Sequence, residues 1–273
     1  MPELPEVETI RRQLDPLLIG RRVIESDSHP SSKFTPGRQI DGATITGVGR
    51  RGKYLLIGLD DERELVAHLG MTGSFRLDDN PSDPQSPHLR AWWRLTASPN
   101  RPPETLLFSD TRRFGRLRVV TANDYSMIPT LAAAGPEPFD PDFNGLRFWK
   151  LLQASRRKLK TKLLSQRPIA GVGNIYADEA LWLAEINPNV TRISQVRATR
   201  LLAALRLVLG EGIEYGGTTL RDYRTVEGNI GTNQTRLKAY GRGGLDCLRC
   251  TTTLRSGVLD GRSTTWCPEC QRY

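Results

Sequence analysis

The sequence predicts an α+β protein of two domains, in which an antiparallel β-sandwich precedes a helical half. Between residues 22 and 120, short β-prone runs alternate with clusters of Gly, Pro, Asp and Asn, a spacing typical of antiparallel sandwiches. After about residue 145, apolar residues recur at helical spacing instead. A chain of 273 residues is long enough for two domains, each with its own core.

The first element predicted is a helix that flanks the sandwich. Proline suits the first helical position and acids suit the first turn, so we expect the helix to begin at Pro5 and to end at Gly20. Apolar residues at helical spacing form its buried stripe: Val7, Ile10, Leu14 and Leu17. The helix therefore begins beside the amino terminus, close to two carboxylates.

The remaining elements follow in chain order and set the predicted domain boundaries. Strands are expected at 54–57, 65–69, 91–95 and 106–108, and the cluster from Asp78 to Pro87 separates two of them. Helices are expected at 148–154, 158–164, 175–184 and 194–212. We predict a β-sandwich domain at 1–121, a Pro-, Ala- and Gly-rich linker at 122–145, a helical domain at 146–240 and a zinc finger at 241–273. Residues 218–235 are polar and glycine-containing, so we expect a long, mobile, functional loop.

The charge of the chain indicates a polyanionic partner. Lys and Arg number 39 against 30 Asp and Glu, which gives a formal net charge of +9. Seven of the basic residues are lysines, and Lys53 stands among arginines in the segment 50–53. Because Lys can lose its proton and Arg cannot, Lys53 is a candidate for acid–base chemistry, with a plain phosphate contact as the alternative. No apolar run approaches the length of a membrane span, and we expect a cytoplasmic protein.

The four cysteines form two C-x2-C pairs separated by sixteen residues: Cys247, Cys250, Cys267 and Cys270. Two such pairs can supply the four thiolates of one structural Zn²⁺, whereas two disulfides would suit a small secreted protein better. Asp260 and Gly261 lie between two β-prone runs and predict a hairpin turn, with Arg262 near its tip.

The amino terminus carries a possible nucleophile. If Met1 is removed, as we expect, Pro2 presents a secondary amine whose pKa is near 8, so part of it is neutral at physiological pH. A neutral amine can attack an electrophilic carbon and form an iminium, and Glu3 is placed to move a proton. From the residues alone, an ordinary chain end is the commoner interpretation of such a terminus.

Nine collinear segments, however, make the chain resemble the formamidopyrimidine-DNA glycosylase family of bacterial DNA-repair enzymes. They are the amino terminus at 1–9, the segments 51–56, 68–74, 110–115, 135–138, 171–179, 216–220 and 240–242, and the cysteine module beyond. The resemblance implies a helix–two-turn–helix bundle in the second domain, with its signature at 171–179, and a β-hairpin zinc finger. It also implies a monomer that binds double-stranded DNA containing an oxidised base, and one structural zinc ion.

The resemblance implies catalytic roles for five residues. Pro2 would attack C1′ of the damaged nucleotide, Glu3 would donate a proton, and Glu6 would support it. Lys53 would assist strand elimination, and Arg262 would stabilise the departing phosphate, because a guanidinium keeps its proton and is a poor acid. The implied activity is that of a bifunctional glycosylase and AP lyase.

The resemblance also implies DNA contacts. A base inside a duplex must be flipped out before it can be excised, and Met71, Arg112 and Phe114 match the residues that fill the resulting gap. Four further residues fall at DNA-contact positions of the family: His88, Arg156, Lys160 and Asn174.

Two alternatives differ in substrate or in kind. An endonuclease VIII-like enzyme would remove oxidised pyrimidines, and a non-catalytic zinc protein would only bind damaged DNA. Many relatives carry aromatic residues after the glycine at 231, whereas this chain has Thr232, Asn233 and Gln234, so its lesion preference can favour formamidopyrimidines or hydantoins over 8-oxoguanine.

Overall fold

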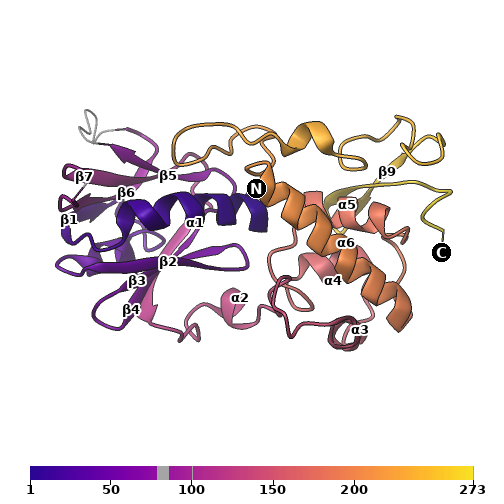
Figure 1. Cartoon of the computed structure of the whole chain (residues 1–273), viewed down its shortest axis with the longest axis horizontal. Helices are drawn as coiled ribbons and strands as arrows, with labels where there is room; N and C mark the ends of the chain where they lie inside the picture. Colours follow the sequence, from indigo (N-terminus) through magenta and orange to yellow (C-terminus); the bar gives the residue numbers. More distant parts are fainter. Residues whose placement is uncertain (79–85, 100, 273) are drawn as a thin grey trace. The chain divides into compact units, whose positions relative to one another are not determined.

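The computed structural model describes residues 1–78, 86–99 and 101–272 and divides them into two compact units. Unit 1 comprises 1–132 and 215–232, and unit 2 comprises 133–214 and 233–273. Figure 1 shows the β-strands of unit 1 and the helices of unit 2. The segment 215–232 belongs to unit 1, although it lies within the predicted helical domain at 146–240, and residues 241–273 form part of unit 2. Most of the predicted turn region from Asp78 to Pro87 lies outside the described residues.

Unit 1 is the predicted antiparallel sandwich. One sheet has the order β1-β6-β7-β5, with bounds Val23–Ser28, Leu89–Leu95, Glu104–Asp110 and Gly73–Asp78. The other has the order β2-β3-β4-β8, with bounds Ile45–Arg51, Tyr54–Leu59, Arg63–His68 and Arg116–Thr121. Alternate residues of β3 are buried, and Leu55, Ile57 and Leu59 enter the core. The α+β class is confirmed.

Three helical elements complete the part of unit 1 that the structure describes. Helix α1 spans Leu4–Leu18 and packs against β2 and β3, with Val7, Ile10 and Leu14 in the core as predicted. A 3₁₀ helix, η1, spans Thr35–Ile40 beside β1, and a short helix, α2, spans Pro129–Ala132 within the predicted linker. The predicted loop at 218–235 contains no helix or strand from 218 to 232, and its residues Tyr223 and Val226 lie in the sandwich core.

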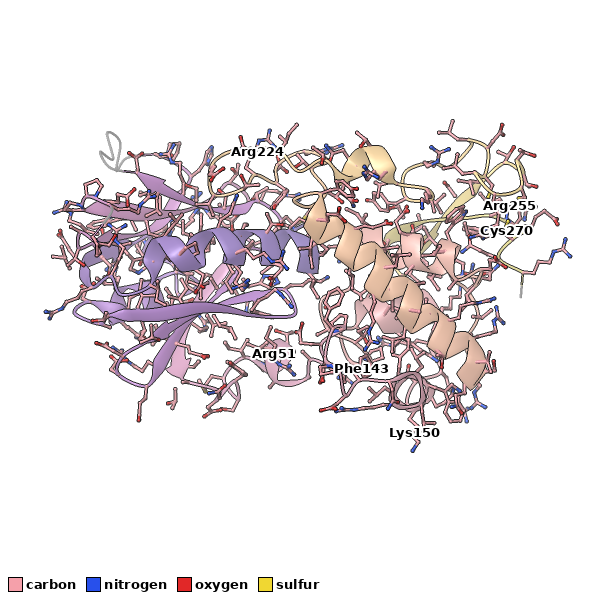
Figure 2. The ribbon with its side chains drawn as sticks, in the orientation of Figure 1. Arg51, Phe143, Lys150, Arg224, Arg255 and Cys270 are labelled. Atoms are coloured by element: carbon pink, nitrogen blue, oxygen red, sulfur yellow. The ribbon has the colours of Figure 1, made fainter. Side chains whose placement is uncertain are left out.

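The described residues of unit 2 form four α-helices, a 3₁₀ helix and a β-hairpin that lies between the two cysteine pairs. The helices are α3 Gly145–Gln153, α4 Leu159–Leu164, α5 Asn174–Leu183 and α6 Gln195–Glu214. Phe143, labelled in Figure 2, is completely buried and meets Phe148 of α3 edge to face. A 3₁₀ helix, η2, spans Asn233–Arg236, and strands β9 Arg255–Leu259 and β10 Arg262–Trp266 form the hairpin.

The hairpin turn is the one that the sequence predicted. Asp260 and Gly261 both have positive φ, 46° and 74°, as a two-residue type I′ turn requires. Arg262 follows the turn directly and is exposed. Among the described residues, each helix is too short or too polar to cross a membrane.

Candidate active site and metal centre

Two buried carboxylate side chains lie at the amino terminus of α1. Glu3 and Glu6 form a capping box, in which the Glu3 backbone N–H donates to Glu6 Oε2 at 2.7 Å. Both side chains are almost fully buried, at 2% and 1% exposure, and Pro2 before them is buried as well. The predicted nucleophile and proton donor therefore lie together at one helix end.

Glu6 also ties this helix end to the segment 215–232. Its Oε1 accepts the Thr218 backbone N–H at 2.7 Å. Gly217 has φ of +87°, and a Cβ there would lie 2.9 Å from Glu6 Cγ, so only glycine fits this close approach. The Tyr223 hydroxyl donates to the Gly216 carbonyl at 3.1 Å. The sequence alone did not indicate that Thr218 and Tyr223 belong to this site, because their hydrogen-bond partner, Glu6, lies more than 200 residues away in the chain.

Lys53 lies in the turn between β2 and β3 and is 8% exposed. Gly52 before it has φ of +56°, which glycine permits in this tight turn. The charge of Lys53 acts on His68, whose pKa is lowered to about 4 by burial first and then by Lys53 and Arg116. His68 is thus neutral at physiological pH.

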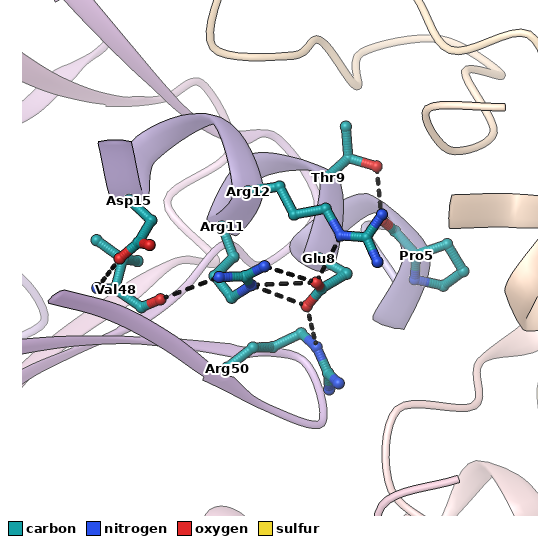
Figure 3. Close-up of polar contacts among 8 residues, drawn as sticks. All are labelled: Pro5, Glu8, Thr9, Arg11, Arg12, Asp15, Val48 and Arg50. Atoms are coloured by element: carbon teal, nitrogen blue, oxygen red, sulfur yellow. Dashed lines mark hydrogen bonds and ion pairs between the residues drawn. The ribbon is translucent and has the colours of Figure 1, made fainter. Parts of the chain in front are cut away.

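An ion cluster connects α1 to the strand that leads to Lys53 (Figure 3). Glu8 of α1 binds Arg50 of β2 at 3.0 Å, and Arg11 and Arg12 bind the same carboxylate. Burial alone would raise the pKa of Glu8, but the three guanidinium groups outweigh it and lower that pKa. Asp15 accepts the Val48 backbone N–H at 2.7 Å, so α1 and β2 are joined at two points.

The three predicted gap-filling residues lie on two loops of unit 1. Phe114 is 49% exposed and Arg112 is exposed, with its guanidinium carbon 4.9 Å from the Phe114 ring centroid. Met71, after β4, is half-buried. Phe114 and Arg112 therefore lie on the surface and outside the core of unit 1. His88 is also exposed.

In unit 2 the predicted DNA contacts differ in exposure. Arg156 and Arg262 are exposed. Asn174 begins α5, is half-buried, and donates from Nδ2 to the Ser263 carbonyl at 3.0 Å, so it supports the hairpin that carries Arg262.

Lys160 has no exposed surface, which contradicts the direct DNA contact that the sequence analysis predicted for it. Its Nζ lies 2.6 Å from Asp178 Oδ1 and donates to the Ser263 carbonyl at 2.7 Å. The other oxygen of Asp178 accepts the Thr265 backbone N–H at 3.0 Å. Burial raises the pKa of Asp178 to about 7 despite the lysine. Lys160 and Asp178 therefore hold β10 against α4 and α5.

The four cysteine thiols are free and converge on one point. Their sulfur atoms all lie within 4.8 Å of one another, with Cys247 to Cys270 at 4.0 Å and Cys250 to Cys267 at 3.4 Å. Four sulfurs at ~2.3 Å from one tetrahedral ion would be about 3.8 Å apart, so the set fits a metal ion. The Trp182 indole N–H donates to Cys247 Sγ at 3.4 Å, an outer contact typical of metal thiolates. Cys270 is labelled in Figure 2.

Comparison with known proteins matches both halves of the chain to family models. Residues 1–117 match the formamidopyrimidine-DNA glycosylase N-terminal domain, and residues 134–224 match the formamidopyrimidine-DNA glycosylase H2TH domain. The formamidopyrimidine-DNA glycosylase of Thermus thermophilus is 46% identical, over 99% of this chain and 98% of that protein. The enzyme of the same name from Deinococcus radiodurans is 42% identical, over 99% and 97%.

Solved structures of the same family superpose on this chain. The MutM (Fpg) protein from Thermus thermophilus superposes with a TM-score of 0.89 at 46% identity, over 99% of this chain and 98% of that one. A complex of Lactococcus lactis Fpg with DNA containing an abasic site superposes with a TM-score of 0.87 at 32% identity, over 99% and 100%. Fold and site thus define a DNA glycosylase with an H2TH domain. Within that class, the chain belongs to the formamidopyrimidine-DNA glycosylase family.

Proposed function

We propose that this chain is a base-excision-repair enzyme that removes oxidised purines, such as 8-oxoguanine and formamidopyrimidines, from double-stranded DNA and then cleaves the strand as an AP lyase. The observation that carries the proposal is the juxtaposition of Pro2, Glu3 and Glu6 at one buried helix end. The reaction requires a free amine at Pro2, and we expect the working enzyme to lack Met1. The four thiolates would bind one zinc ion, and this ion would be structural because all four ligands come from the protein.

The chemistry proceeds from the secondary amine. Pro2 N attacks C1′ of the flipped nucleotide, the glycosidic bond between C1′ and the base breaks, and the base leaves with the electron pair of that bond and with the proton that Pro2 N releases. Glu3 then protonates O4′, which opens the sugar and leaves an iminium between Pro2 N and C1′. A secondary amine gives an iminium that has no N–H to lose, so the positive charge persists. This charge acidifies the C2′ proton for β-elimination of the 3′ phosphate.

Unit 1 and unit 2 would each supply cations for the phosphates. Lys53 would hold a phosphate and assist elimination, and Arg262 would stabilise the phosphate that departs in δ-elimination. Asn174 and Arg156 would add phosphate contacts, and His88 a further DNA contact. The product is a one-nucleotide gap.

Borohydride trapping tests the proposal. The wild-type chain should form a covalent adduct with duplex DNA containing 8-oxoguanine, and mass spectrometry should place the adduct on Pro2. Pro2→Gly should lower the yield roughly tenfold or more, because a primary amine gives an imine that can lose its charge. Met127→Leu, at a side chain that is 78% exposed, serves as a control for handling. An adduct on Lys53 instead, or full trapping by Pro2→Gly, would contradict the assignment.

Two alternatives give different outcomes in the same assay. A stronger adduct with thymine glycol than with either purine lesion would indicate the endonuclease VIII-like specificity. Binding to lesion DNA without any adduct would indicate a damage-binding protein. The residues Thr232, Asn233 and Gln234 make the ranking of 8-oxoguanine against formamidopyrimidine the informative comparison within the purine lesions.

A further inference from the structure

Asp110 joins the two loops that carry the gap-filling residues. It ends β7 and is completely buried. Its Oδ1 accepts the Thr72 hydroxyl at 2.5 Å, and its Oδ2 accepts the Gly115 backbone N–H at 2.7 Å. One carboxylate therefore holds the loop after β4, which carries Met71, and the loop after β7, which carries Arg112 and Phe114.

Thr72 makes a second connection between the same loops. Its Oγ1 accepts the Arg112 backbone N–H at 3.1 Å while its proton goes to Asp110. A hydroxyl has one donor and two acceptor sites, so this arrangement uses its capacity in both directions. Thr72 directly follows Met71, and the two gap-filling loops are thus joined next to their functional side chains.

The backbones of the loops also touch. Gly70 has φ of +65°, and a Cβ there would lie 2.4 Å from the Phe114 carbonyl carbon. A Cβ on Gly115 would lie 2.9 Å from Phe108 Cζ and 3.0 Å from Asp110 Oδ2. Because neither position has room for a side chain, the loops can adopt this separation only with glycine at both.

Arg90 supplies a positive charge close to the buried Asp110. Its Nε donates to the Asp110 backbone carbonyl at 2.8 Å, and its side chain is 3% exposed. The carboxylate thus has two donors and a nearby guanidinium, as a buried charge requires. Nothing in the proposed chemistry uses Asp110, Thr72 or Arg90.

We infer that Asp110 and Thr72 are positioning residues that hold Met71, Arg112 and Phe114 as one preformed wedge for opening the duplex. The inference depends on the function proposed above. Groups that enter a base stack act best when they are held in place before contact, because ordering flexible side chains on binding opposes insertion. The pair should therefore matter for duplex DNA and not for a nucleotide that is already unstacked.

The matched variants Thr72→Val and Thr72→Ser test the inference. Valine keeps the branched shape but loses the hydroxyl, whereas serine keeps the hydroxyl. The excision rate should be measured under single-turnover conditions on 8-oxoguanine in a duplex and on the same strand without its complement. Thr72→Val should be slower roughly tenfold on the duplex and unchanged on the single strand, and Thr72→Ser should match wild type on both. Asp110→Asn keeps the shape of the side chain but loses one acceptor. Its excision rate on the duplex should lie between the rates of Thr72→Val and Thr72→Ser.

A spectroscopic readout separates positioning from general damage to the fold. The fluorescence of 2-aminopurine beside the lesion reports unstacking, and its rise should be slowed by Thr72→Val and restored by Thr72→Ser. Thermal unfolding of each variant identifies any loss of fold. Equal rates for Thr72→Val and wild type on the duplex, or an equal loss on both substrates, would overturn the inference. Failure of the wild-type chain to act on the duplex would instead overturn the proposed function.

Discussion

The protonation state of His68 determines whether it can hold the loop that follows β4. It ends β4, its ring lies 4.8 Å from that of Tyr54, and its Nδ1 accepts the Gly70 backbone N–H at 3.2 Å. Only a neutral imidazole can accept this hydrogen bond, because both nitrogens of the charged ring are donors. The lowered pKa, about 4, therefore keeps the start of the Met71 loop in place throughout the physiological range.

The pKa of His68 predicts how stability changes with pH. The folded-state pKa is about 4 and the ordinary value is 6.5, so the unfolded chain binds more protons between these pH values. The free energy of unfolding should therefore rise by about 2 to 3 kcal/mol as pH increases from 4 to 6.5, and this contribution should disappear as pH falls again. Denaturant unfolding across this range should show the rise in wild type and a flatter profile in His68→Gln. Exposed His88→Gln should retain it, and identical profiles for the two variants would refute the assignment.

Elements were easier to predict than the contacts between them. The strands follow from alternating apolar residues, and the β9–β10 hairpin from Asp260 and Gly261, because these signals are local. The pair Thr72 and Asp110 and the contact of Glu6 with Thr218 join residues far apart in sequence, and neither residue type nor spacing reveals such partners. The same limit applies to Lys160. Its position among basic residues predicts a DNA contact, whereas its burial depends on how distant segments pack around it.

The buried pair of Lys160 and Asp178 predicts a cost for removing either partner. Lys160→Met should leave the Asp178 carboxylate buried without its cation and lower the free energy of unfolding by roughly 3 to 5 kcal/mol. The double variant Lys160→Met, Asp178→Leu should recover part of this loss, because it removes both charges together but leaves the Thr265 backbone N–H without its acceptor. Chemical denaturation measures both. Exposed Lys150→Met, in α3, is the matched control and should change little. A double variant no more stable than the single one would argue against the ion pair.

The same pair predicts an effect on the hairpin. Since Lys160 and Asp178 hold Ser263 and Thr265 of β10, their loss should move Arg262 at its tip. Gel analysis of the cleaved strand would then show β-elimination product accumulating over δ-elimination product, with trapping at Pro2 unchanged.

The whole molecule carries its positive charge on both units. The formal net charge is +9, and four thiolates with one Zn²⁺ would reduce it by 2, to +7. Exposed cations occur throughout, among them Arg224 in unit 1 and Lys150 and Arg255 in unit 2 (Figure 2). Many are in ion pairs within the chain, such as Arg94 with Glu25 at 3.2 Å, so net charge overstates the number of cations available to DNA.

Salt titration distinguishes the cations that contact DNA from those that only add to the charge. Each phosphate neutralised contributes about −0.9 to the slope of log K against log salt concentration, because counterions are released. Arg156→Gln, which removes an exposed and proposed phosphate contact, should make the slope shallower by about 1 for lesion and undamaged duplex alike. Arg94→Gln removes the same formal charge from a residue paired with Glu25 and should leave the slope unchanged. Fluorescence anisotropy on one labelled duplex gives both slopes. Equal changes in the two variants would mean that overall charge, and not the position of Arg156, governs binding.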